Sequence, residues 1–405
     1  MLVCVSAEFL SPNYFENPYE TFRDFHERKP IFWHEPIKAW IISSYAEVEK
    51  GLSNLNLNAG ERIAAASSHL SVGEKHEFSK IISNLNNWIV FQDPPKHTRL
   101  RKLINKSFTP RTIEAFRPNI EKIVNDLVTS ALKKQKFDFV TELSFKLPAL
   151  VICELLGIPR ERQDDVRHWS DSHAGFSASA QVSHEAAKAA NDASIEAESY
   201  LFTLFDDLRK NPGENILSKL VNASEGEDHL SYEELAALTT QLFFAGFETT
   251  EGLIGNFLIA LHNYPDQLAI LKADRSKMDA AVEEALRFDS SILKQSRVAS
   301  IDVEIAGHLI RKGEYCHFMI GAANHDPIRY NNPDQFIIER LDIGQSSFGH
   351  GIHFCIGAPL ARLETKVLMN SLLDRAPELQ IRQTEIIYPQ LFAIRKPLEL
   401  QVSVH

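Results

Sequence analysis

The amino-acid sequence predicts a mainly α-helical fold with a minor β portion, and three features support this. A long helical pattern begins at Ser231 and continues without a break to about Asn263. Helical patterns also dominate the chain from about residue 93 onward. From Ile301 the hydrophobic period changes to two, and residues 397–402 alternate in the same way.

Composition indicates one large globular chain. No linker or charge block divides the 405 residues, so we expect a single domain over 1–405, with its β portion from the N-terminal segment and the C-terminal strands. The net charge of −11 argues against nucleic acid as a partner. Four cysteines are too few for a disulfide framework. With no basic leader and no bilayer-length apolar run, we expect a cytoplasmic monomer without a membrane anchor.

The first half of the chain supplies strand and helix signals in turn. A strand-like run covers Ala39–Ser44, and a polar, variable stretch follows from about Gly60 to Asn87. We expect an amphipathic helix over Glu121–Leu132 and a more uniformly apolar, buried helix over Phe145–Leu156.

A segment rich in alanine, serine and glutamate covers Ser177–Ala197. We interpret it as a helix rather than a linker, because alanine and glutamate are strong helix formers and glycine is absent. Its small apolar face predicts light packing, which would suit a mobile lid.

The long helix has a capping box at its start, Ser231-Tyr232-Glu233-Glu234. At 1.5 Å per residue it is roughly 45–50 Å long. Its apolar residues leave little polar face, so it is a core helix. A second helix is expected from about Ser276 to Arg287.

The segment Phe348–Pro359 places Cys355 in a loop with glycines at 349, 351 and 357. Pro359 suits a first helical turn, and apolar residues then follow at helical spacing. Cys355 would therefore lie at a helix N-terminus, which favours a thiolate. A single thiolate suits axial ligation of haem iron.

Other interpretations of Cys355 compete with this one. A lone cysteine is most often a small buried hydrophobe. His350, His353 and Cys355 are also zinc-type ligands, although no second Cys/His pair occurs elsewhere, and the C-x-x-C-H pattern of c-type haem attachment is absent. The residues of this loop alone leave a haem ligand and a buried thiol both open.

The long helix contains Ala245-Gly246-Phe247-Glu248-Thr249-Thr250 in its interior. Glycine there costs about 1 kcal/mol relative to alanine, so its presence needs a reason. Either Ala245-Gly246 allows a close helix–helix contact, or the small pair lets a flat cofactor lie against the helix. In the second case Thr249 and Glu248 could deliver protons.

Charged residues form two further candidate groups. Glu284 and Arg287 share a helix face, and apolar neighbours suggest a buried pair that needs more partners, with Arg340 downstream as one candidate. His97 and Arg101 lie four apart after Asp93-Pro94-Pro95 and could grip an anionic group. A solvated basic face would equally explain them, and Arg297 in a strand-like stretch is another cation of ambiguous role.

Together these motifs resemble the cytochrome P-450 family from about Asp93 to the C-terminus. The haem-loop pattern F-x-x-G-x-x-x-C-x-G is met by Phe348, Gly351, Cys355 and Gly357. The A-G-x-[DE]-T pattern is met by Ala245, Gly246, Glu248 and Thr249. The E-x-x-R pair is Glu284 and Arg287, with Arg340 as third member of a buried triad, and D-P-P-x-H-x-x-x-R is met by Asp93, Pro94, Pro95, His97 and Arg101. The chain looks like the soluble, bacterial type.

The resemblance implies a P-450 fold with the long central helix over haem b, and Cys355 as the proximal thiolate. It implies that His97, Arg101, Arg297 and His353 bind the haem propionates, and that Glu248 and Thr249 relay protons during oxygen activation. Its cofactor-contacting positions also include Ala245, Gly246, Phe348 and Gly357. The activity implied is insertion of one oxygen atom from O2 into a small molecule, by hydroxylation or epoxidation.

The resemblance also implies electrons from NAD(P)H through a reductase and a separate ferredoxin or flavodoxin. An acidic partner would dock on local positive charge from Arg99, Lys102, Lys106, Arg111, Arg362 and Lys366. For each of these residues a merely solvated basic face is an equal alternative.

Largely apolar positions form the implied substrate pocket, so a hydrophobic or amphipathic substrate is expected. They are Phe243, Phe247, Ile292, Leu293, Lys294, Leu391 and Phe392, with the variable segment 60–90 and the lid at 176–190. Lys294 hints at an anionic or carbonyl group, although a solvent-facing lysine is the more common case. Two alternatives are a peroxide-driven peroxygenase, against which Glu248-Thr249 argues, and a haem-binding module that recruits carrier-bound intermediates.

Overall fold

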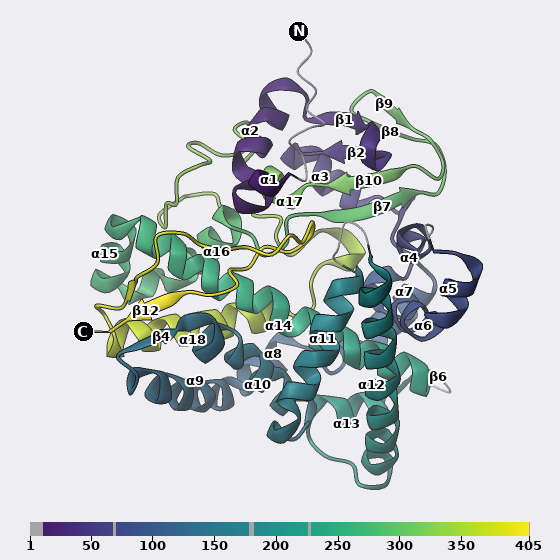
Figure 1. Ribbon diagram of the computed structural model, residues 1–405, viewed down its shortest axis with the longest axis horizontal. Helices are drawn as coiled ribbons and strands as arrows, with labels where there is room; N and C mark the ends of the chain where they lie inside the picture. The colour runs from purple at the N-terminus through teal and green to yellow at the C-terminus, as the bar shows by residue number, and fades with distance from the viewer. Residues whose placement is uncertain (1–10, 68–69, 178–181, 226–227, 405) are drawn as a thin grey trace. The chain divides into compact units, whose positions relative to one another are not determined.

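The computed structural model describes residues 11–67, 70–177, 182–225 and 228–404. The chain forms two compact units, each built from separate stretches of sequence. The first unit comprises residues 1–58, 124–146 and 249–405, and the second comprises 59–123 and 147–248. Helices dominate both units, as predicted (Figure 1). The expectation of a single domain over 1–405 stays a prediction.

The first unit contains a five-stranded sheet whose strands come from distant parts of the sequence. The order is β1-β2-β10-β7-β3, so the purple N-terminal strands in Figure 1 lie beside green strands from the last third of the chain. β10 is parallel to β2, and the other neighbours are antiparallel. The strands are β1 (Ile31–His34), β2 (Ala39–Ile42), β3 (Leu57–Asn58), β7 (Gln295–Ala299) and β10 (Tyr315–Phe318).

Two smaller sheets complete the β portion of this unit, with orders β11-β12-β4 and β8-β9. The predicted alternation is confirmed over shorter spans than expected. Ile301 lies outside β8 and is 51% exposed, and the hairpin turn falls at Ala306-Gly307, where both residues have positive φ. The strands are β4 (Lys136–Asp138), β8 (Val303–Ile305), β9 (His308–Ile310), β11 (Gln380–Ile381) and β12 (Gln401–Ser403).

Helices pack around these sheets, and the first two have side-chain N-caps. Ser11 and Asn17 accept hydrogen bonds from backbone N–H groups of α1 and α2, and each cap precedes a proline in the first helical turn. The helices of this unit are α1 (Pro12–Glu16), α2 (Pro18–Arg28), α3 (Tyr45–Ser53), α15 (Pro265–Ala273), α16 (Met278–Phe288), α17 (Ile320–Ala323) and α18 (Ala358–Arg375), with 3-10 turns at Glu35–Ile37, Arg275–Lys277 and Gly351–His353 and a π turn at Val140–Ser144.

The second unit is almost entirely helical. One core cluster joins Trp88 and Phe91 to Phe176 and to alanines of α12. The elements are α4 (Arg62–Ala66), α5 (Val72–Glu77), α6 (Ser79–Asn86), α7 (Lys96–Asn105), α8 (Pro110–Ala115), α10 (Lys146–Leu156), α11 (Gln163–Ser177), α12 (His184–Lys210), α13 (Ile216–Val221) and the hairpin β5 (Ser224–Glu225) with β6 (Asp228–His229). Short 3-10 turns cover Ile89–Phe91 and Arg160–Arg162.

The helix expected over 177–197 is confirmed from His184 to Ala197 and wrong at Val182 and Ser183, which are not helical. α11 ends at Ser177, and α12 begins at His184 with the Ser183 side chain as its N-cap. Residues 178–181 lie outside the described part of the chain. The alanine face of α12 is fully buried rather than lightly packed, because small side chains allow close approach to α11 and α6. The role of this region as a mobile lid stays a prediction.

The helices α9 (Arg117–Leu132) and α14 (Tyr232–Asn263) each contribute several residues to both units, and α10 contributes Lys146 to the first unit. The capping box of α14 is confirmed. The Glu234 N–H donates to Ser231 Oγ over 3.2 Å, and the Ser231 N–H donates to Glu234 Oε2 over 3.1 Å. The predicted helices at 121–132 and 145–156 are confirmed as α9 and α10, and the one at 276–287 as a 3-10 turn followed by α16.

Candidate active site

The loop before α18 holds Cys355 through its backbone. The Cys355 N–H donates to the Phe348 carbonyl over 3.0 Å, which closes the loop. Gly349 and Gly351 have φ of +69° and +68°. A Cβ at Gly351 would lie 2.9 Å from the Ser53 Cα, so both its conformation and the close backbone contact require glycine. α18 begins at Ala358, three residues after the thiol, with Pro359 in its first turn, as predicted.

Cys355 differs in exposure from the other described cysteines. Cys153 and Cys316 are fully buried, and burial raises the pKa of each thiol to about 12. Cys355 is partly exposed, so it fits an accessible ligand rather than a buried hydrophobe. Among the described residues, no group of three histidine, cysteine or acidic side chains is placed to hold a metal ion. The zinc alternative therefore finds no support.

The middle of α14 presents small side chains from a helix that is otherwise buried. Phe243, Phe247 and Glu248 are buried, whereas Ala245 is exposed and Thr249 is half-exposed. A Cβ at Gly246 would lie 3.2 Å from Ile152 Cδ1 of α10. The sequence allowed two roles for Gly246, and the structure confirms the close helix–helix contact. Contact between Gly246 and a cofactor stays a prediction.

The predicted propionate-binding residues lie in different local settings. His97 is buried and Arg101 half-buried on α7. The preceding Asp93 carboxylate accepts the N–H groups of Ala59 and Gly60 over 2.9 and 2.8 Å, so this aspartate shapes the loop. Arg297 is 1% exposed on β7 and donates to the Ser296 carbonyl.

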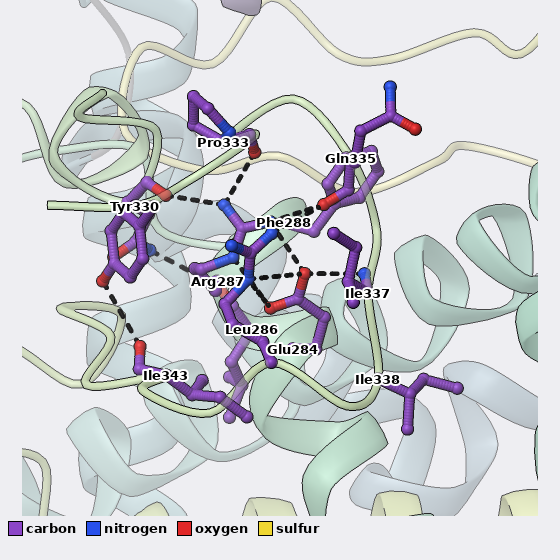
Figure 2. Close-up of polar contacts among 12 residues, drawn as sticks. Glu284, Leu286, Arg287, Phe288, Tyr330, Pro333, Gln335, Ile337, Ile338 and Ile343 are labelled. Carbon is purple, nitrogen blue, oxygen red and sulfur yellow. Dashed lines mark hydrogen bonds and ion pairs between the residues drawn. The ribbon is translucent and has the colours of Figure 1, made fainter. Parts of the chain in front are cut away.

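Glu284, Arg287 and Arg340 form the predicted buried triad, and Figure 2 shows Arg287 and Glu284 side by side at its centre. Arg287 donates to both carboxylate oxygens of Glu284 over 2.8 Å. Its remaining N–H groups donate to the carbonyls of Asn324, Pro333 and Gln335 over 2.8–2.9 Å. The guanidinium therefore uses all five donors. Arg340 Nε and the Ile337 N–H also donate to Glu284, so the buried charges are fully hydrogen-bonded.

The partly exposed Cys355 thiol, held in a glycine loop before α18, is a group that could ligate a haem iron. A family model described as "Cytochrome P450" matches residues 185–402. The chain belongs to the cytochrome P450 family.

Relatives extend this match over most of the chain. Cytochrome P450 107B1 of Saccharopolyspora erythraea is 37% identical over 372 residues, 89% of each chain. The biotin biosynthesis cytochrome P450 of Bacillus subtilis is 32% identical and covers 98% of this chain and 99% of its own. The solved structure of P450BioI with an acyl carrier protein ligated to hexadec-9Z-enoic acid has a TM-score of 0.90 at 32% identity, covering 97% of this chain and 99% of that one.

As a member of this family the protein is a haem-thiolate monooxygenase that acts on small molecules. It uses haem, O2 and electrons delivered by partner proteins. The described residues include no helix long and apolar enough to cross a membrane. The mainly helical P450 fold with small sheets is confirmed.

The predicted pocket positions near β7 and the C-terminal loop lie close together in the first unit. Ile292 pairs with Ile394 through an isolated β-bridge, and Leu293 and Phe392 are buried in one cluster. Lys294 is half-buried beside them. Sequence reasoning missed two residues beside Lys294. Ser296 accepts a hydrogen bond from Lys294, and His317 contacts Ser296. Ser296 and His317 meet only because β7 pairs with β10.

Three of the predicted docking cations are engaged in ion pairs. Arg362 pairs with Glu283, and Lys366 with Asp279. Arg99 pairs with Glu234. Their carboxylate partners reduce the local positive charge. Lys102, Lys106 and Arg111 are exposed, and the role of all six cations in partner docking stays a prediction.

Proposed function

We propose that this P450 hydroxylates or epoxidises a hydrophobic or amphipathic small molecule. The observation that supports it best is the partly exposed Cys355 thiol at the start of α18. Bound haem would supply oxygen activation, which its thiolate ligand promotes. We further propose that a ferredoxin or flavodoxin and its reductase supply the electrons, and that the enzyme acts as a cytoplasmic monomer.

Each set of residues has a distinct task in this proposal. Cys355 would ligate the iron, and His97, Arg101, Arg297 and His353 would hold the propionates by charge-assisted hydrogen bonds. Glu248 and Thr249 would relay protons during oxygen activation. Ala245, Gly246, Phe348 and Gly357 would contact the haem.

Apolar side chains exclude water and bind the substrate. We assign substrate contact to Ile292, Leu293, Leu391 and Phe392 of the first unit, and to Phe243 and Phe247 of α14 on the basis of the family resemblance alone, because both phenylalanines are fully buried in the protein. Such a lining suits a hydrocarbon body.

A second candidate is oxidation of an intermediate tethered to a carrier protein. The full-length similarity to P450BioI, whose structure contains an acyl carrier protein, favours it. Turnover of an acyl carrier protein thioester at a rate at least equal to that of the free acid would support this candidate.

The decisive measurement is the absorption spectrum of the reduced, carbon monoxide-bound protein. We expect the strongly red-shifted Soret band of a thiolate-ligated haem. An unshifted, imidazole-type band would overturn the proposal. A ligand screen monitored by the ferric spin-state shift then identifies the substrate class.

A further inference from the structure

One face of α14 packs closely against residues 391–397, which we call the 391–397 segment. Gly252 and Gly255 are three residues apart and so share this face. A Cβ at Gly252 would lie 2.8 Å from the Arg395 carbonyl oxygen, and one at Gly255 would lie 2.7 Å from Pro397 Cγ. Glycine is unfavourable inside a helix, and at these two positions it permits a contact that a larger side chain would block.

Hydrogen bonds hold the 391–397 segment from two sides. The Arg395 N–H donates to the Ser291 carbonyl over 2.9 Å, and Arg395 Nε donates to the Asp289 carboxylate over 2.9 Å. From α14, Asn256 Nδ2 donates to the carbonyls of Asp289 and Arg395 over 3.1 and 3.2 Å. The segment and the residue that ends α16 are therefore bound to α14 through the same side chain.

A buried ion pair joins the 391–397 segment to α14 two residues after Thr249. Lys396 Nζ donates to Glu251 Oε2 over 2.8 Å. The Lys396 and Glu251 side chains are 14% and 5% exposed, so both charges lose most of their hydration. Because of that cost a buried ion pair adds little net stability, whereas its demand for one geometry can specify a single arrangement of the chain. A role in positioning is therefore favoured for this pair.

We propose that Glu251 and Lys396 are positioning residues whose ion pair sets where the 391–397 segment lies along α14. The inference rests on the proposed function, in which Leu391 and Phe392 of this segment contact the substrate. Neither Glu251 nor Lys396 needs to touch the substrate itself. Breaking the ion pair should loosen the contact between the segment and a bound hydrocarbon chain, without changing haem ligation.

The test uses the haem-loaded enzyme with imidazole and 1-octylimidazole. Both ligate iron through a ring nitrogen, and only the second carries a hydrocarbon chain that needs an apolar surface. Dissociation constants are measured from the change in the haem absorption spectrum. We expect the wild type to bind 1-octylimidazole about tenfold more tightly or better. Lys396→Met should reduce this preference about fourfold for each methylene group that loses its contact, with imidazole affinity unchanged. Lys396→Arg should keep most of the preference.

Hydrogen exchange provides a readout that needs no ligand. The Arg395 amide is bonded to the Ser291 carbonyl, so peptides that contain it should exchange slowly in the wild type. Lys396→Met and Glu251→Gln should each speed exchange in these peptides about threefold or more, with peptides from α2 unchanged. The double variant should exchange no faster than the faster single variant, because both changes act on the same contact.

Glu142→Gln is the matched control, since Glu142 is another largely buried carboxylate of the first unit that pairs with lysines. It pairs with Lys134 and Lys146 over 2.7 and 3.2 Å and is 17% exposed. Whatever its stability, this variant should keep both the wild-type preference for 1-octylimidazole and the slow exchange at Arg395. If Lys396→Met does not fold, Glu251→Gln provides the same comparison.

Three results would each overturn the inference. They are no preference of the wild type for 1-octylimidazole over imidazole, an unchanged preference in both Lys396→Met and Glu251→Gln, and an equal loss of preference in Glu142→Gln. A wild type without the thiolate band in its reduced, carbon monoxide-bound spectrum would instead overturn the proposed function.

Discussion

Glu284 and Arg287 form a two-point ion pair in which neither side chain has any exposed surface. Because the pair is fully buried, removing one charge leaves the other uncompensated. We expect Glu284→Gln to lower the free energy of unfolding by about 3–5 kcal/mol, measured by urea denaturation.

An exposed pair of the same spacing provides the matched control. Glu114 and Arg117 are also three residues apart, but 62% of the Glu114 side chain and 33% of the Arg117 side chain are exposed. Glu114→Gln should cost less than about 1 kcal/mol. Equal losses in the two variants would contradict the role given to burial.

Cys355→Ala should abolish the thiolate-type spectrum of the reduced, carbon monoxide-bound protein, because no other described thiol is accessible. Cys153→Ala, which removes a fully buried thiol, should keep that spectrum even if stability falls. A thiolate band that persists in Cys355→Ala would refute the assignment.

Thr249→Ala should uncouple electron consumption from product formation. Without the hydroxyl, protons reach oxygen less selectively, so the yield of product per NAD(P)H should fall about tenfold or more. The ratio is measured with a surrogate ferredoxin and reductase. Thr250→Ala, the same change at a buried neighbour, should stay coupled, and tight coupling in Thr249→Ala would count against the relay.

His173 makes stability depend on pH. Burial lowers the pKa of His173 to about 4 from its usual 6.5. Below pH 6.5 the unfolded chain binds a proton that the folded chain does not, so stability falls as pH decreases from 6.5 toward 4 and is unaffected above 6.5. At pH 5 the loss is about 2 kcal/mol.

Replacing His173 isolates this contribution. In His173→Gln the loss of unfolding free energy between pH 7 and pH 5 should be smaller than in the wild type by about 2 kcal/mol. His168→Gln, on the exposed face of the same helix, should leave the wild-type pH dependence unchanged. An identical pH profile in His173→Gln would show that the imidazole is not buried in its neutral form.

Local signals in the sequence were the most reliable predictors. The capping box at Ser231 and Glu234 needs only residues three apart, and it is present as expected. The E-x-x-R pair likewise lies on one helix face. The continuous helix over 177–197 failed because composition alone does not locate a helix start, whereas the N-cap Ser183 was a readable signal.

Long-range contacts were beyond the sequence. Arg99 and Arg362 were predicted to be docking cations. Their ion-pair partners, Glu234 and Glu283, lie 135 and 79 residues away in the sequence, so sequence analysis could not identify these ion pairs. The surroundings of Lys294 depend on the register of β7 against β10, which a single sequence does not specify. Only the folded structure shows which distant charges and which distant strands form pairs.

Arg287 has a consequence for how this chain can vary. Its guanidinium holds three backbone carbonyls between Asn324 and Gln335, and Arg340 holds those of Asn331 and Asn332. An inserted or deleted residue in this stretch would move at least one carbonyl away from its donor. Homologues and engineered chimaeras that keep both arginines should therefore preserve the length of this stretch.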